Sequence, residues 1–366
     1  MEKVKVLHLE LDAHMGGIES FLYNLYRAID KERVQFDFVT RANTPAREDE
    51  LRKLGANIYK VSSYRHPLKY MEDLDKIICQ GDYNVIHIHK NSAAIVLPFF
   101  VTRKHKNVAV FVHSHNTKPS IGGIASVLHN LNKGVLYKSA DEHFACSSAA
   151  GKWMFGTKQF VVVKNGIIAK DFIYNERIRK EYRDKLNIAY NSIVLGHVGR
   201  FTEQKNHKAL IDIFYEIQKI RQDSVLLLIG DGENVPEIKN KVYNYGITDK
   251  VFFLGNKSDV ANWLMCMDAF VMPSLYEGLP ISAVEAQATG AETFLSDTIS
   301  RETQLTDSVV WFSNDADKKI LAQRILSVIS SKKDRSKYNY DVIAAGFDME
   351  ETAKTMLDYY SKYAAI

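Results

Sequence analysis

The sequence has few cysteines and no long apolar run, and both absences exclude classes of protein. Its three cysteines, Cys79, Cys146 and Cys266, are far apart and form no CxxC pair. We therefore expect small buried side chains rather than disulfides or metal ligands. No segment approaches the ~18 apolar residues of a membrane span. The first apolar run is interrupted by polar and charged residues, unlike the core of a signal peptide. These absences predict a cytoplasmic protein.

Common nucleotide-binding and nucleic-acid-binding motifs are also missing. Neither GxGxxG nor GxxxxGK[ST] occurs, which argues against a simple dehydrogenase and a P-loop enzyme. DxD triplets occur at Asp73–Asp75 and Asp315–Asp317, but neither directly follows an expected strand and no metal-ligand cluster stands out, so we expect no metal cofactor. Residues 1–168 are basic, with 23 Lys and Arg against 16 Asp and Glu. Because no aromatic-basic module accompanies this charge, we expect no nucleic-acid partner. Anionic lipid headgroups or a diphosphate-bearing substrate fit the basic half, as does ordinary solvated surface.

The 366 residues contain two successive stretches in which apolar strands alternate with helical patterns. Strands are expected at Val4–Leu11 and Val108–Val112 in the first stretch, and at Ile193–Val198 and Ala269–Met272 in the second. The boundary is expected near Asn165–Phe172. This alternation predicts an α/β protein with two Rossmann-like, parallel-sheet domains. Open sheets of this kind bind ligands beyond the carboxyl ends of their strands, so the residues that follow each strand are the candidate site.

Two sets of residues follow strands of the first domain. Gly16 and Gly17 open a helix, where free N–H groups and a partial positive charge can meet an anion. A simple turn explains the pair equally well. His113 and His115 follow the strand Val108–Val112. A histidine there can donate to a sugar hydroxyl, although a structural histidine bonded to the backbone is the more common explanation for such a residue taken alone. His113 is preferred because it comes directly after the apolar strand.

The second domain places charged groups after two of its strands. Arg200 and Lys205 lie in a loop before a helix and suit a diphosphate, unless they are merely surface cations. Glu277 and Glu285 are eight residues apart around a helix start, and their carboxylates can accept from the vicinal hydroxyls of a sugar. The N–H groups of Gly278 and Leu279 can meet phosphate oxygens. An exposed loop acid beside a helix-face acid explains either glutamate alone, but it explains the whole arrangement poorly.

These motifs together resemble a known family. The segment SLYEGLPISAVEAQATG, with Glu277 and Glu285, resembles the EX7E motif of retaining family 4 glycosyltransferases of the GT-B fold. GRFTEQKN resembles their donor-phosphate loop, MGGIES their Gly-Gly loop and VHSHN their cleft histidine. LIGDGE and FFLGNKSDV also occur in family order. The matches run from residue 4 to about 297 and look most like the EpsF-like exopolysaccharide and capsule subgroup.

The resemblance implies a role for each site residue. Arg200 and Lys205 would hold the donor diphosphate, Glu277 would contact the donor sugar, and His113 would help to position the transition state, with His115 as the alternative histidine. Glu285 would bind the ribose, and the segment around Gly255 would line the base pocket. The donor-binding residues so implied are Gly16, Gly17, Asn165, Gly199, Gly255, Asn256, Lys257, Gly278, Leu279 and Glu285.

The family also implies domain limits and partners. The first domain would span residues 1–168 on the acceptor side, the second 169–345 on the donor side, and the C-terminal helix, 346–366, would cross back to the first. A hexosyl group would pass from a UDP-sugar, gripped between the domains, to a hydroxyl of a polyprenyl-diphosphate-linked saccharide. Configuration would be retained and no metal required. The protein would then work at the inner face of the membrane, with the stretch 121–136 as a lipid contact; a core-packing helix is the equal alternative for that stretch.

Two departures from the family pattern and two rival functions remain. The segment GAETFLSD stands where the family has a GLPVI-like run, and Lys164–Ile168 lacks the Pro and Asp of its PNGID segment. Neither change removes a charged group of the candidate site, but both weaken inference about donor specificity. A sugar-nucleotide epimerase or sugar-phosphate synthase on the same fold is one rival. A non-catalytic binding subunit of a polysaccharide complex is the other.

Overall fold

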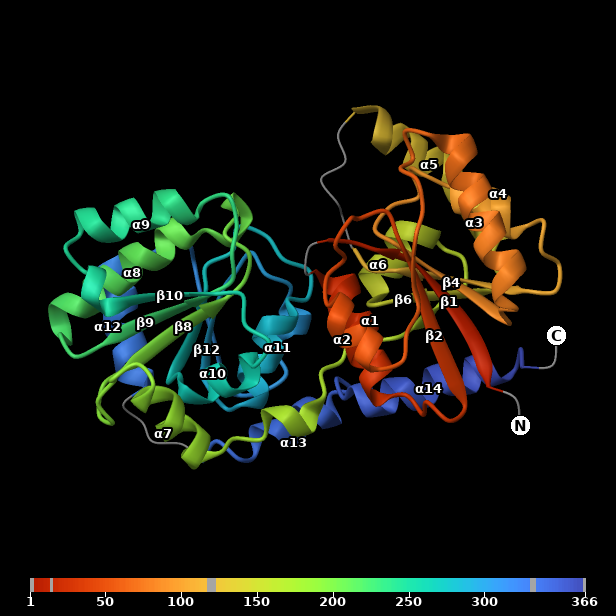
Figure 1. Ribbon diagram of the computed structural model, residues 1–366. Helices are drawn as coiled ribbons and strands as arrows, with labels where there is room; N and C mark the ends of the chain where they lie inside the picture. The colour runs from red at the N-terminus through yellow and green to blue at the C-terminus, as the bar shows by residue number, and fades with distance from the viewer. Residues whose placement is uncertain (1–2, 14–15, 117–122, 330–333, 365–366) are drawn as a thin grey trace. The chain divides into compact units, whose positions relative to one another are not determined.

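The computed structural model describes residues 3–13, 16–116, 123–329 and 334–364 and divides the chain into two compact units (Figure 1). Unit 1 consists of residues 1–166 with 348–366, and unit 2 of residues 167–347. The chain therefore passes between units twice. Each unit is built on one parallel sheet, which confirms the predicted α/β class with two Rossmann-like domains.

Unit 1 contains a seven-stranded parallel sheet in the order β3-β2-β1-β4-β5-β6-β7. Its strands are β1 (Val4–Leu11), β2 (Val34–Thr40), β3 (Ile58–Lys60), β4 (Val85–Lys90), β5 (Ala109–Ser114), β6 (Glu142–Ala145) and β7 (Val161–Val162). Its helices are α1 (Gly17–Ala28), α2 (Glu48–Lys53), α3 (Pro67–Gly81), α4 (Leu97–Thr102), α5 (Gly123–Lys138), α6 (Ser148–Phe155) and α14 (Met349–Ser361).

Unit 2 contains a six-stranded parallel sheet in the order β10-β9-β8-β11-β12-β13. Its strands are β8 (Val194–Val198), β9 (Val225–Ile229), β10 (Val251–Gly255), β11 (Ala269–Met272), β12 (Glu292–Ser296) and β13 (Val309–Phe312). The helices are α7 (Glu176–Asp184), α8 (His207–Ile220), α9 (Val235–Asn244), α10 (Val260–Cys266), α11 (Ile281–Ala288), α12 (Lys318–Ile329) and α13 (Tyr338–Ala344). Short 3₁₀ turns are η1 (Ala169–Phe172), η2 (Glu203–Lys205), η3 (Thr248–Lys250) and η4 (Arg301–Thr303).

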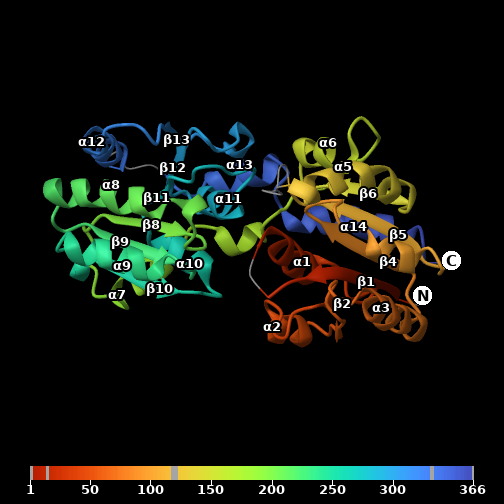
Figure 2. The ribbon, with the colours of Figure 1, turned by 90° about the horizontal axis from the view of Figure 1, so that it is seen from above.

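Helices cover both faces of each sheet, as Figure 2 shows for each unit by itself. Every residue of β9 is buried, which is the pattern expected of a parallel strand enclosed by helices. In unit 2, α8, α9 and α12 share one apolar core, while α10 and α11 share the other. In unit 1, α14 packs against α1 and β1. The last helix of the chain is therefore part of the first unit.

The strand order of each sheet reverses direction at one point. β1 lies between β2 and β4, and β8 lies between β9 and β11. The loops that follow β1 and β4, or β8 and β11, diverge to opposite sides, which opens a crevice at the carboxyl ends of those strands. These two points are where the candidate residues of the sequence should lie.

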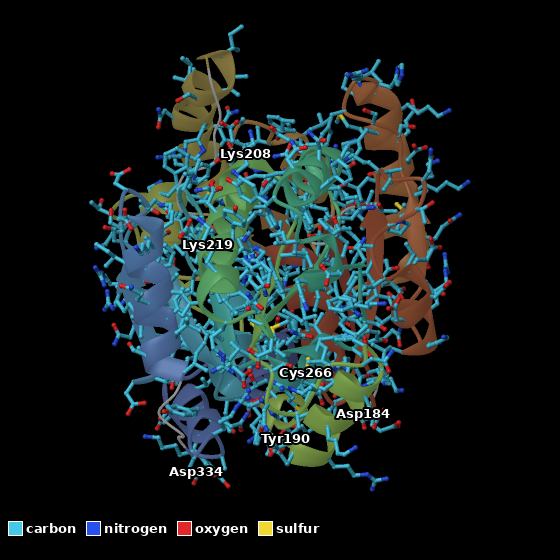
Figure 3. All side chains as sticks on the ribbon, turned by 90° about the vertical axis from the view of Figure 1, so that its left-hand side faces the viewer. Asp184, Tyr190, Lys208, Lys219, Cys266 and Asp334 are labelled. Atoms are coloured by element: carbon cyan, nitrogen blue, oxygen red, sulfur yellow. The ribbon has the colours of Figure 1, made fainter. Side chains whose placement is uncertain are left out.

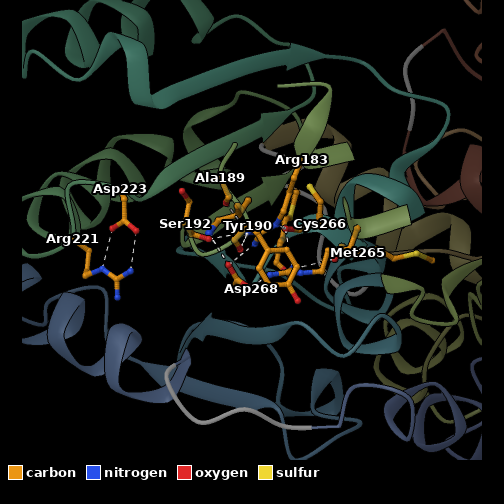
Figure 4. Close-up of polar contacts among 12 residues, drawn as sticks. Arg183, Ala189, Tyr190, Ser192, Arg221, Asp223, Met265, Cys266 and Asp268 are labelled. Atoms are coloured by element: carbon orange, nitrogen blue, oxygen red, sulfur yellow. Dashed lines mark hydrogen bonds and ion pairs between the residues drawn. The ribbon is translucent and has the colours of Figure 1, made fainter. Parts of the chain in front are cut away.

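A buried ion pair anchors the opposite end of the unit 2 sheet. Arg183 of α7 is almost fully buried and donates to the carbonyl oxygens of Tyr190, Ser192 and Cys266 and to Asp268 Oδ2 at 2.8 Å (Figure 4). Asp268 directly precedes β11, and the same Oδ2 accepts from the Val194 N–H at the start of β8 at 2.8 Å. This pair fixes the amino ends of the two strands whose carboxyl ends carry the candidate site.

Two expectations are corrected or limited by the fold. Only Cys266 is buried, whereas Cys146 is partly buried and Cys79 is exposed on α3, because Cys79 falls on the solvent side of an amphipathic helix. The stretch 121–136 begins outside the described residues. In its described part, in α5, His129 and Leu136 are buried and Leu136 belongs to the unit 1 core, whereas other apolar residues of the same helix are exposed. Ile124 is 79% exposed and Leu131 70% exposed. None of the described helices is long and apolar enough to cross a membrane.

Candidate functional site

In unit 2 the candidate residues lie in the loops after β8 and β11. The first loop carries Lys205 in η2, and the second carries Glu277 before α11. Lys205 Nζ lies 2.7 Å from Glu277 Oε1, with side-chain exposures of 17% and 11%. The contact is an ion pair whose alignment leaves that Oε1 without a hydrogen bond. The fold thus brings Lys205 and Glu277 together, with both side chains largely buried but still accessible to a ligand.

Backbone contacts hold these two loops together. The Leu275 N–H donates to the Gln204 carbonyl at 2.8 Å, and the Gln204 side-chain amide donates to the Tyr276 carbonyl at 2.9 Å. The Ser300 N–H donates to the Glu277 carbonyl at 3.2 Å. Since three segments share the constraint, Glu277 keeps its position without a ligand, as a preorganised binding group should.

Other predicted residues of unit 2 surround this pair. Arg200 lies in the same loop as Lys205 but is half exposed and pairs with Glu233 at 3.3 Å. Gly278 and Leu279 precede the N-terminus of α11, which no side chain of its cap residue closes. Glu285 is partly buried in α11. Gly255 ends β10, Asn256 and Lys257 follow it, and Asn256 is exposed. Cationic, anionic and free N–H groups are therefore available at one edge of the sheet.

Two glycines that the sequence analysis did not assign to the site support the Gly199–Arg200 loop. A side chain on Gly230 would place its Cβ 2.1 Å from the Gly199 carbonyl oxygen, and one on Gly232 would lie 2.5 Å from the Phe201 carbonyl oxygen. Both have positive φ angles, of +130° and +158°. The glycines of the LIGDGE segment therefore allow its backbone to lie directly against the backbone of the Gly199–Phe201 loop. Two glycines so close together in the sequence could have suggested such a close approach.

Unit 1 has a candidate site of its own, a cavity of about 570 Å³ at the carboxyl ends of β1 and β4 that is lined by polar and charged as well as apolar residues. Gly16 and Gly17 lie on its wall, at the start of α1. Glu10 is partly buried there, with a side chain 11% exposed, and has a φ of +80°, which is unusual for a residue other than glycine. Its carboxylate pairs with Lys90 at 2.6 Å and Arg41 at 3.0 Å. Burial alone would raise the pKa of Glu10, but Lys90 and Arg41 outweigh it and hold that pKa below its ordinary value.

The structure separates the two histidines between which the sequence could not decide. His115 lines the cavity, and His113 is fully buried beneath it. The reason is that β5 continues to Ser114 instead of ending at Val112, so His113 still belongs to the strand and pairs with His89. Burial lowers the pKa of His115 to about 3, with the Asn165 side chain opposing the shift. The imidazole at the cavity is neutral at physiological pH.

Comparison with known proteins identifies the family. Residues 15–170 match the family model described as Glycosyltransferase Family 4, and residues 178–343 match the one described as Glycosyl transferases group 1. The chain belongs to the family 4 glycosyltransferases. The family's two models thus fall one on each unit, apart from α14.

Individual relatives of this glycosyltransferase agree with that assignment. EpsF of Bacillus subtilis (strain 168) is 29% identical over 370 residues, covering 98% of this chain and 96% of EpsF. A protein of Escherichia coli named UDP-Gal:alpha-D-GlcNAc-diphosphoundecaprenol alpha-1,3-galactosyltransferase is 23% identical over 321 residues, or 80% of this chain and 79% of that one.

A solved structure supports the GT-B fold of this glycosyltransferase. Anabaena Alr3699/HepE, crystallised with UDP and glucose, superposes with a TM-score of 0.79 at 17% identity, covering 98% of this chain and 99% of HepE. At that identity the likeness shows the fold alone.

Proposed function

We propose that this glycosyltransferase transfers a hexosyl group from a UDP-sugar to a hydroxyl of a lipid-linked saccharide during exopolysaccharide or capsule synthesis. The names of the relatives support the substrate classes, since one is a UDP-galactose enzyme with a diphosphoundecaprenol-linked acceptor and another is a capsular polysaccharide glycosyltransferase of Staphylococcus aureus. The observation that carries the proposal is the pair of Lys205 and Glu277, held 2.7 Å apart beside the open start of α11.

The charges of this pair suit a leaving nucleoside diphosphate. In the structure Lys205 is neutralised by Glu277. A bound diphosphate would take over Lys205, and Glu277 would then accept hydrogen bonds from sugar hydroxyls. Arg200 and the N–H groups of Gly278 and Leu279 would share the remaining phosphate charge. We infer that these groups substitute for a metal ion, and that activity persists in EDTA.

Retention of anomeric configuration is part of the proposal. The described groups of the unit 2 edge provide charge stabilisation rather than an evident protein nucleophile. The transition state would resemble an oxocarbenium ion leaving the diphosphate, and the leaving phosphate would take the proton of the acceptor hydroxyl. NMR of the glycosidic product would show the configuration, and an inverted linkage would contradict this step.

Mutation of the pair tests the proposal. Lys205→Ala and Glu277→Ala should each lower kcat/KM for the UDP-sugar by about 10²–10³-fold, the usual effect of removing one transition-state contact. Lys208→Ala is the matched control, because Lys208 lies on α8 (Figure 3), is exposed and pairs with Glu237 rather than with Glu277. Turnover within threefold of the parent in either test variant would refute the assigned role. Consumption of UDP-sugar without any acceptor would instead favour the epimerase reading.

The exposed apolar face of α5 supports the proposal that the acceptor is linked to a lipid. Ile124, Val127, Leu128 and Leu131 follow one helical stripe and are all exposed. Such a stripe can enter the interface of a bilayer that holds the lipid-linked acceptor. Leu131→Glu should abolish sedimentation with vesicles of phosphatidylglycerol while leaving UDP binding unchanged. Equal sedimentation of the variant and parent proteins would contradict the membrane contact.

A further inference from the structure

Five buried or nearly buried histidines line one face of the unit 1 sheet. His8 on β1 pairs in register with His87 on β4, and His89 on β4 pairs with His113 on β5, with His115 just beyond. They share a face because alternate residues of a strand point the same way. Aromatic side chains of α1 and α14, including Phe21 and Tyr360, close over this face.

Three of these rings are linked by hydrogen bonds. His8 Nδ1 lies 3.0 Å from His89 Nε2, and His89 Nδ1 lies 2.9 Å from His115 Nε2. Burial lowers the pKa of each of the three rings far enough to keep it neutral. Each link between neutral rings needs one N–H and one lone pair. The whole chain therefore has only two self-consistent directions.

The inner end of the chain selects the direction. His8 Nε2 is buried and has no hydrogen-bond partner among the described residues. An unpaired buried N–H is rarer in proteins than an unpaired acceptor, so Nε2 should be the bare nitrogen. His8 then donates from Nδ1 to His89, and His89 donates from Nδ1 to His115. The proton of His115 must consequently be on Nδ1.

The outer end meets the Asn165 side chain. Asn165 is 9% exposed and acts on His115 as a hydrogen-bond partner that raises the histidine pKa, as an accepting oxygen does. In the described part of the chain, His115 Nδ1 and Asn165 Oδ1 are both buried without a hydrogen bond of good geometry, so each is the unpaired group that the other can satisfy. With Oδ1 turned to His115, the Asn165 NH₂ group faces the start of α1, where a Cβ added to Gly17 would lie 3.7 Å from Nδ2.

We propose that His8, His89 and His115 form a one-way chain of neutral imidazoles that orients the Asn165 amide, so that its NH₂ group and the N-terminus of α1 together bind an accepting oxygen of the nucleotide sugar. Glu19 occupies the other side of this helix start, where its carboxylate accepts from the Asp12 N–H at 3.2 Å. The Gly17 side is left for the ligand. The ligand assignment rests on the proposed function, whereas the direction of the chain does not.

The direction of the chain is tested by NMR of protein labelled with ¹⁵N-histidine. Long-range ¹H–¹⁵N cross-peaks distinguish the Nδ1–H from the Nε2–H form of each neutral ring, and loss of peaks in His115→Gln assigns that residue. We expect the Nδ1–H form for His8, His89 and His115. An Nε2–H form at His115, or a mixture of both forms, would overturn the chain even if the protein proved to have another activity.

A metal ion is the rival occupant of these rings. Ligand nitrogens of His8, His87 and His89, and of His89, His113 and His115, lie within 4.8 Å of one another. Elemental analysis of the purified protein should find far less than one equivalent of zinc. One equivalent of zinc that disappears in His89→Phe would overturn the hydrogen-bonded chain.

Mutations connect the chain to the ligand. His89→Phe should shift His115 toward a mixture of forms and raise KM for the UDP-sugar about tenfold, the effect of losing one hydrogen bond, with KM for the acceptor unchanged. His87→Phe is the matched control, because His87 is equally buried but its Nδ1 bonds to Tyr360 instead of the chain. It should leave both KM values within twofold of the parent.

A second variant, Asn165→Asp, keeps the proposal testable if His89→Phe fails to fold. Asn165→Asp keeps an oxygen for His115 but removes the NH₂ group, so KM for the UDP-sugar should rise as in His89→Phe while the Nδ1–H form of His115 persists. An unchanged KM in Asn165→Asp would overturn the ligand assignment. An unchanged His115 form in His89→Phe would overturn the orienting role of the chain.

Discussion

The buried histidines of unit 1 should make its stability fall steeply in mild acid. Burial lowers the pKa of His8 and His115 to about 3, and it lowers the pKa of His87, His89 and His113 well below the ordinary value. In the unfolded chain each of them has a pKa of about 6.5. Below that pH the unfolded state takes up protons that the folded state excludes. The stability present above pH 6.5 is therefore lost as the pH falls toward the folded pKa.

The size of this effect follows from the number of groups. Between pH 7 and pH 5 one such histidine costs about 2 kcal/mol of unfolding free energy. For the five of unit 1 the sum is about 10 kcal/mol, comparable to the whole stability of a typical domain. Unit 2 has two histidines, His197 and His207, whose pKa is lowered mainly by burial, and it should lose about 4 kcal/mol. Unit 1 should thus unfold first on acidification.

Urea unfolding followed by circular dichroism at pH 7, 6 and 5 measures this loss. His87→Phe should reduce the loss between pH 7 and pH 5 by about 2 kcal/mol, because one proton-binding site of the unfolded chain is gone. His66→Phe is the control, since His66 is exposed, and it should leave the loss unchanged. A total loss below about 2 kcal/mol in the parent protein would show that the rings accept protons while folded, and the reasoning would fail.

Two further substitutions test contacts that support the site. Gly230→Ala should destabilise the protein by about 3 kcal/mol or more and slow turnover, because the new Cβ would strike the Gly199 carbonyl oxygen; thermal melting and kinetics would show it, and a parent-like melting temperature would contradict it. Asp268→Ala should cost about 3–5 kcal/mol in urea unfolding, because it leaves the buried guanidinium of Arg183 unpaired. A loss under about 1 kcal/mol would mean that the pair is better solvated than its burial implies.

Strands enclosed by helices could be predicted well from the sequence. β1 and β11 have the predicted bounds, Val4–Leu11 and Ala269–Met272. For β11 the reason is that a strand buried on both faces is a continuous apolar run that ends where polar residues begin. β5 shows the limit of this rule. Its last two residues, His113 and Ser114, are polar but buried, and the pattern therefore ended the strand too early and placed His113 in the loop.

The sequence placed the candidate residues after strands but did not pair them. Lys205 and Glu277 were each expected in a loop after a strand, and their contact depends on β8 and β11 being neighbours in the sheet. Glu10 could not be found in this way, because it lies within β1 and reaches the cavity only through its unusual φ angle. The hydrogen bonds among the histidines could not be predicted from the sequence either, because a link between β1 and β4 depends on strand order and register rather than on spacing in the sequence.

The membership of α14 in unit 1 has a consequence for synthesis on the ribosome. Proteins are made from the N-terminus, and most domains can fold as soon as their own residues emerge. Here Tyr360, which covers the histidine face and bonds to His87, follows the whole of unit 2 in the sequence and therefore leaves the tunnel after it. Unit 1 begins before unit 2 in the chain but can be completed only after unit 2 has been synthesised. Its aromatic and imidazole surface therefore stays uncovered while unit 2 is translated. A nascent chain stalled before Asp348 should for that reason be a better chaperone substrate than the released protein.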